Sequence, residues 1–90
     1  MLNYRTAKDF LKACLPAGTL IKIYEKIYVV IDTNERKLTY IRLDEENDGT
    51  YDLSRHAATI FSIYEPTEAL AVIAQYQSRW EKFKKQYDLP

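Results

Sequence analysis

Residues 19–43, TLIKIYEKIYVVIDTNERKLTYIRL, decide the fold of this 90-residue chain. β-branched and aromatic side chains alternate with polar ones along most of this stretch, which is typical of strands that bury one face. The stretch predicts three antiparallel strands, which we expect at 19–24, 27–32 and 37–43. The first two strands are expected to fold back on each other about Glu25-Lys26, although this turn lacks the usual Asn or Gly.

A further hairpin is predicted downstream of these strands. Asn47-Asp48-Gly49 is a strong turn signal, because Asp-Gly tolerates the positive φ that a tight turn needs. Helical and strand patterns overlap over residues 50–64. The sequence here predicts a strand at 50–53, a helical turn at 54–57 and a strand at 58–64.

Helices are expected on both sides of the strands. Thr6 can cap a helix over residues 7–15, which Pro16 and Gly18 then end. A longer helix is expected over residues 66–87, where five apolar residues recur at spacings of 3, 4, 3 and 4, namely Ile73, Tyr76, Trp80, Phe83 and Tyr87. The predicted fold is therefore α+β. It is a single domain over residues 1–90, with a small curled antiparallel sheet or barrel of four to five strands between an N-terminal helix and a longer C-terminal helix.

The composition is that of an ordinary soluble globular domain, with 47% hydrophobic and 29% charged residues. The longest apolar run, residues 69–74, has six residues, against about 20 for a membrane-spanning helix. No apolar stretch typical of a signal peptide follows the N-terminus. A single cysteine cannot form an internal disulfide. We therefore expect a cytoplasmic protein with no membrane partner.

Catalytic machinery is largely excluded by counting. One Cys, one His and two Gly cannot supply a four-ligand Cys/His zinc site, a dinucleotide fingerprint or a P-loop. His56 lies close to Ser54 and Asp52, but side chains that alternate along a strand lie parallel and do not meet as nucleophile and base. Cys14 falls in the apolar stripe of the first predicted helix, where a free cysteine usually packs as a small hydrophobe. We expect no enzyme activity, no catalytic residue and no cofactor.

The run from Asp44 to Asp52 is strongly acidic and partly resembles a calcium loop. The position of the bidentate Glu is held by Arg55, however, so no metal site is expected. The same residues suit a solvated hairpin tip that binds a protein. The predicted contact patch comprises Asp44, Glu45, Glu46, Asp48 and Asp52, with Tyr40 and Tyr51 as nearby aromatic anchors.

The zero net charge conceals a segregation along the chain. Residues 1–43 carry eight basic and four acidic groups, which gives a charge of +4. Residues 44–68 carry one basic and seven acidic groups, a charge of −6, and residues 69–90 carry four basic and two acidic groups, a charge of +2. An acidic middle favours a basic partner. The leading interpretation is a non-enzymatic protein-binding module, such as a small inhibitor, adaptor or accessory protein of bacterial or phage type.

Tyrosines and basic residues leave alternatives open. Tyr24 and Tyr28 share the phase of Lys22, opposite to the isoleucines, which suits a recognition face, an ordinary outer face or a face covered by one of the helices. The second interpretation is a nucleic-acid-binding small β-barrel that uses basic residues of the last helix: Arg79, Lys82, Lys84 and Lys85. The aromatic residues between them fall on the apolar helix face, where they cannot stack on bases, and this weakens the nucleic-acid interpretation. The pattern does not distinguish a monomer from a homodimer.

Overall fold

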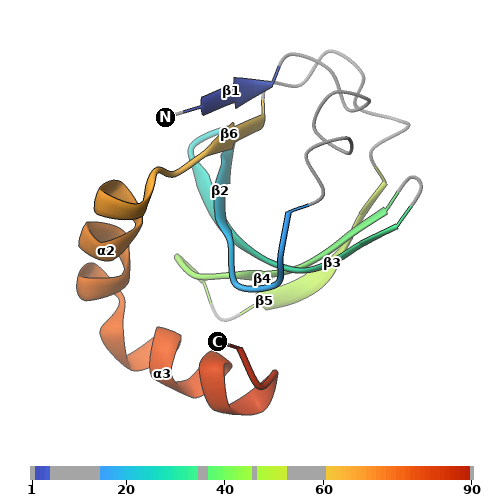
Figure 1. The fold of residues 1–90 in the computed structure, drawn as a ribbon. Coiled ribbons are helices and arrows are strands. Elements are labelled where there is room, and N and C mark those ends of the chain that lie inside the picture. The colour runs from blue at the N-terminus through green and yellow to red at the C-terminus, as the bar shows by residue number, and fades with distance from the viewer. Residues whose placement is uncertain (1, 5–14, 35–36, 46, 53–60, 90) are drawn as a thin grey trace.

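The computed structural model describes residues 2–4, 15–34, 37–45, 47–52 and 61–89 (Figure 1). The described elements are β1 (Leu2–Tyr4), β2 (Leu20–Ile23), β3 (Lys26–Asn34), β4 (Lys37–Arg42), β5 (Asn47–Asp52), β6 (Phe61–Ile63), α2 (Pro66–Gln75) and α3 (Gln77–Gln86). The strands form one antiparallel sheet in the order β1-β6-β2-β3-β4-β5. The predicted α+β class is confirmed, whereas the sheet formed by the described residues is open and has six strands instead of the predicted four to five.

The β2–β3 hairpin determines which residues share a face. Ile23 pairs with Lys26, so the turn consists of Tyr24 and Glu25, one residue earlier than predicted. Both residues have positive φ, 48° and 64°, as a type I′ turn requires, although neither is Gly or Asn. This register places Ile21 directly opposite Tyr28.

Both faces of the sheet are consequently buried. One face carries the cluster of Ile21, Ile23, Tyr28, Val30, Leu38 and Phe61. On the other face, strand residues pack against the helices in a cluster of Leu20, Val29, Ile41, Leu43, Trp80, Phe83 and Leu89. Tyr28 is therefore a core residue and does not share an outer face with Lys22, while Tyr24 is 68% exposed in the turn.

The β4–β5 connection differs from the predicted hairpin. Arg42 pairs with Asn47, so residues 43–46 form the connection and Asn47-Asp48-Gly49 belongs to β5. Gly49 lies opposite Tyr40, and a Cβ at this glycine would lie 3.1 Å from the Tyr40 hydroxyl oxygen. The glycine therefore permits close approach of an aromatic ring and does not form the predicted turn.

The predicted helix over 66–87 is two helices separated at Tyr76, whose φ and ψ are −119° and 37°. α2 starts with Pro66 at its first turn and a capping box, in which the Glu65 backbone N–H donates to Glu68 Oε1 at 3.1 Å. α3 buries Trp80 and Phe83, as its periodicity predicts. Figure 1 shows α2 and α3 following one another around the outside of the curled sheet.

Several predicted elements lie partly or wholly outside the described residues. The predicted helix over 7–15, apart from its last residue, and the helical turn over 54–57 lie outside the described residues. β6 falls within the strand predicted at 58–64, of which residues 58–60 are not described. The short strand β1, which pairs with β6 at one end of the sheet, was not predicted.

Candidate functional site

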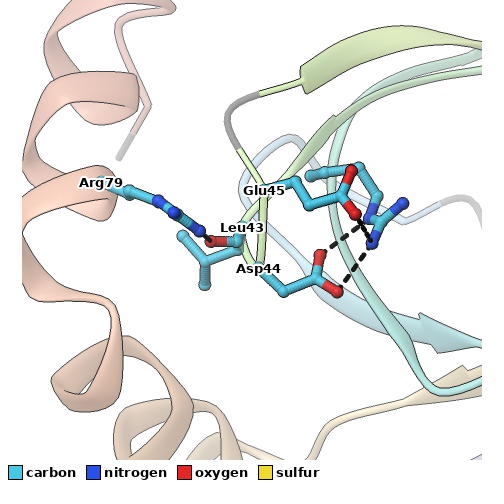
Figure 2. A network of polar contacts seen from close by, with 5 residues as sticks. Leu43, Asp44, Glu45 and Arg79 are labelled. Atoms are coloured by element: carbon cyan, nitrogen blue, oxygen red, sulfur yellow. Dashed lines mark hydrogen bonds and ion pairs between the residues drawn. The ribbon is translucent and has the colours of Figure 1, made fainter.

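A buried cation organises the β4–β5 connection. Arg42 ends β4 and is only 7% exposed. Its Nε donates to Asp44 Oδ1 at 2.7 Å and its Nη2 to Asp44 Oδ2 at 2.8 Å. Nη2 also lies 3.4 Å from Glu45 Oε1. Figure 2 shows both carboxylates turned toward the same guanidinium, so two acidic residues of the predicted patch bind a cation within the protein.

The Arg42 guanidinium also lies near aromatic rings of the sheet. The Arg42 guanidinium lies 5.4 Å from the centroid of the Tyr28 ring, within range of a cation–π interaction. Tyr28 in turn meets Tyr40 edge to face, with ring centroids 4.6 Å apart. Tyr40, predicted as a binding anchor, is half-buried and packs against the core in this row.

The charges of the Arg42–Asp44 pair are mutually stabilised. Burial alone would raise the pKa of Asp44, but the hydrogen bonds and charge of Arg42, together with backbone hydrogen bonds, outweigh it and hold that pKa below its ordinary value. Hydrogen bonding to Asp44 raises the pKa of Arg42 further above its already high value. The formal charges of Arg42, Asp44 and Glu45 sum to −1. The Glu45 side chain, 60% exposed, presents that charge to solvent.

The α3 helix is tied to the same connection. Arg79 Nη1 donates to the Leu43 carbonyl oxygen at 3.2 Å, across 36 positions of sequence (Figure 2). Its guanidinium also lies 5.9 Å from the centroid of the Tyr76 ring. Arg79, predicted as a nucleic-acid contact, thus has a role inside the protein.

The other basic residues of that prediction, Lys82, Lys84 and Lys85, are exposed on α3. The aromatic residues among them, Trp80 and Phe83, are buried and cannot stack on bases. A nucleic-acid contact here would rest on charge alone.

An open groove of about 450 Å³ lies beside the connection. Its wall is Asp44 on one side and the α2–α3 junction on the other, the lining residues being Ala74, Gln75, Tyr76, Gln77, Ser78 and Arg79. The lining is mostly polar, which suits contact with a hydrated surface more than the enclosure of an apolar ligand. The sequence did not predict this groove, because neither Pro nor Gly marks the helix break at Tyr76.

The remaining predicted contact residues follow the connection into β5. Glu46 and the side chains of Asp48 and Tyr51 lie outside the described part of the chain. Asp52 is half-buried at the end of β5, opposite Lys37. Sequence reasoning missed Arg42, although its signal was present: an arginine in the same strand phase as Leu38 and Tyr40 is a cation on a buried face, which requires a partner.

Comparisons with family models, curated proteins and solved structures found no significant match. Within the described ranges, no three His, Cys, Asp or Glu residues are placed to hold a metal ion. The same part of the chain contains no helix that is both long and apolar enough to cross a membrane. Cys14 and His56 lie outside the described residues.

Proposed function

We propose that this chain is a non-enzymatic protein-binding module that acts in the cytoplasm, in the manner of a small inhibitor, adaptor or accessory protein of bacteria or phages. The binding surface is the acidic segment, which we define as residues 44–52. It carries five carboxylates and no basic residue in nine positions. The partner presents a basic surface to it.

The observation that carries this proposal is the attachment of the segment to a buried cation. Arg42 bonds Asp44 through two short hydrogen bonds, so the connection is preorganised before any partner arrives, and less entropy is lost on binding. Five negative charges in the segment and one positive charge on Arg42 leave −4. A concentrated charge of this sign steers a basic partner and raises the association rate.

The test begins with two parallel affinity purifications from cells that produce the protein, one with and one without nuclease treatment. Mass spectrometry identifies recovered proteins in both, and the untreated sample is also examined for bound nucleic acid. Binding of the recovered protein is then measured for Glu45→Lys and for Asp32→Lys. Asp32 is exposed on β3, outside the acidic segment, so it is a matched control for the charge change.

We expect Glu45→Lys to slow association several-fold and to flatten its salt dependence, and Asp32→Lys to change neither. Equal effects of the two substitutions would remove the acidic segment from the proposal. Recovery of nucleic acid alone, with binding lost on substitution of Lys82, Lys84 and Lys85 by glutamate, would replace it with the nucleic-acid interpretation.

A further inference from the structure

The β2–β3 turn holds two residues in a backbone conformation that suits neither of them. Tyr24 and Glu25 have φ values of 48° and 64°, in the left-handed region that Gly and Asn occupy at much lower cost. An Asn-Gly pair would form the same turn with less strain. Strained residues of this kind gather at functional sites, where the side chain matters more than the backbone cost.

Burial of the two side chains offsets little of this strain. Tyr24 contacts the rest of the protein with the smaller part of its surface and is 68% exposed. The Glu25 side chain is 87% exposed, and it forms an ion pair with Lys22 at 3.0 Å. Ion pairs at the surface add little stability. Both turn side chains therefore present most of their surface to solvent.

The turn lies at the same end of the sheet as the acidic segment. Tyr28 pairs with Arg42, and beyond this pair the Leu43 N–H donates to the Ile27 carbonyl oxygen at 3.0 Å. The turn ends just before Ile27, and the acidic segment begins just after Leu43. Both therefore leave the sheet at the same end.

Charges of the turn and of the acidic segment act on a common group. Burial raises the pKa of the Tyr64 phenol, and the positive charge of Lys22 opposes this effect. The negative charges of Glu25 and Asp44 raise the same pKa. Since both carboxylates lie within electrostatic range of one side chain, a basic surface that approaches the acidic segment also meets the turn.

An exposed aromatic ring at the apex of a turn becomes buried only in a concave surface. Tyrosine offers a large contact area with few rotatable bonds, and it is enriched among the residues that dominate binding energy. The groove of a second copy of this chain fits the ring poorly, because its lining is mostly polar and includes Asp44. A pocket with apolar walls in the basic partner fits both the ring and the neighbouring carboxylates.

We propose that Tyr24 inserts into an apolar pocket of the basic partner protein, while the carboxylates of Glu25 and Glu45 pair with basic groups at the rim of that pocket. Burial of the ring supplies affinity, and the carboxylates supply orientation and steering. The inference rests on the proposed function, because it names the aromatic anchor of the same interface. Tyr24 takes the role that the sequence assigned to Tyr40, which packs against the core.

Tyr24→Asn separates binding from folding, because asparagine tolerates a positive φ and removes the ring. We expect an unchanged or higher melting temperature and at least about tenfold weaker binding of the protein recovered by affinity purification. Tyr24→Phe keeps the ring and should bind nearly as tightly as the native chain. Leu70→Ala is the matched control, because Leu70 is a large hydrophobic residue of similar exposure on α2, and it should leave binding unchanged.

A photoreactive benzophenone is the probe for the pocket. The full chain, with Tyr24 replaced by p-benzoylphenylalanine, is irradiated in the cells that produce it, and the covalent adduct is mapped by mass spectrometry. The same replacement at Leu70 is the control. We expect several-fold more adduct from position 24, formed with the protein recovered by affinity purification, at a peptide that contains both apolar and basic residues.

Three results would overturn the inference: native-like binding by Tyr24→Asn, equal adduct yields at the two positions, or an adduct of position 24 with a second copy of the chain. A clearly lower melting temperature of Tyr24→Asn would also overturn it, because the tyrosine would then serve stability. If Glu45→Lys weakens partner binding and Tyr24→Asn does not, the anchor is wrong while the proposed function holds. If neither substitution weakens it, both fail.

Discussion

Replacing Asp44 with asparagine removes the charge opposite a buried guanidinium while keeping the size of the side chain. In the native protein Arg42, 7% exposed, donates two hydrogen bonds to Asp44. After Asp44→Asn, the remaining carboxylate near Arg42 is that of Glu45, at 3.4 Å on a side chain that is 60% exposed. The substitution therefore leaves a poorly compensated charge in the interior.

The expected cost follows from that burial. Removing one partner of a fully buried ion pair typically costs 3–5 kcal/mol. The Asp44 side chain is 19% exposed and asparagine can still accept a hydrogen bond, so we expect a loss of about 2–3 kcal/mol in the free energy of unfolding. Glu45→Gln removes the same charge from the exposed partner of Arg42, and we expect it to cost less than about 1 kcal/mol.

Urea unfolding monitored by fluorescence measures both variants, because Trp80 is the single tryptophan of the chain and is buried. A third variant, Arg42→Met with Asp44→Asn, removes both charges. Its loss should be smaller than the sum of the losses measured for Arg42→Met alone and Asp44→Asn alone, because the double variant leaves neither member of this pair unpaired. If Asp44→Asn and Glu45→Gln lower the free energy of unfolding equally, the buried Arg42–Asp44 pair is not more stabilising than the exposed Arg42–Glu45 contact, and the reasoning is refuted.

Three further predictions follow from the same geometry. The pKa of Asp44 is lowered in the folded protein. Its ionised carboxylate therefore contributes fully to stability above about pH 4, and this contribution is lost as the pH falls through the folded pKa. Between pH 7 and pH 2.5, the urea midpoint of Asp44→Asn should fall less than that of the native chain. Glu25 has a φ of 64°, so Glu25→Gly should be about 1 kcal/mol more stable than Glu25→Ala. Both substitutions remove the carboxylate, but only alanine keeps the backbone strain of a positive φ. Equal melting temperatures of the two variants would contradict the type I′ turn. Trp80→Ala should cost about 3–5 kcal/mol, whereas Leu70→Ala, at a position 67% exposed, should stay within about 0.5 kcal/mol. Urea titrations of these two variants are followed by circular dichroism, because Trp80→Ala removes the single tryptophan.

Alternating hydrophobicity predicted the central strands, because the local sequence pattern and the pairing in the folded sheet favour the same extended conformation. Ile21, Ile23 and Ile41 are buried in β2 and β4, at the positions where the pattern places them on strands. The β2–β3 turn was misplaced by one residue, because Tyr24 and Glu25 adopt positive φ without the residue types that favour it. Strand pairing on both sides of the turn outweighs the local preference.

Long-range packing also explains the other differences. Asn47-Asp48-Gly49 has a strong turn preference, yet pairing with β4 extends it and Gly49 lies against Tyr40. The break at Tyr76 carries no Pro or Gly, so the apolar spacing alone predicted one continuous helix. Gly49 contacts another strand, and Tyr76 packs against the cluster between the sheet and the helices, so both involve contacts distant in sequence that no local pattern contains.

The acidic residues of the candidate site were predicted from the sequence, but their different roles were not. Asp44 and Glu45 are neighbours of the same charge, and only the position of Arg42 shows that one is held in the interior while the other faces solvent. Arg79 likewise looked like a free cation, because its acceptor, the Leu43 carbonyl, lies 36 positions away.

This difference between neighbouring carboxylates determines which substitutions can test binding. Asp44 bonds Arg42 and lines the groove at the α2–α3 junction, so its charge reversal would change stability and recognition together. Glu45 lies in the same connection and reaches Arg42 only at 3.4 Å from an exposed position, so its reversal changes the field that a partner meets and should leave most of the stability intact. A weakened complex in Glu45→Lys therefore reports recognition, whereas the same loss in an Asp44 variant reports recognition only after its unfolding free energy has been measured.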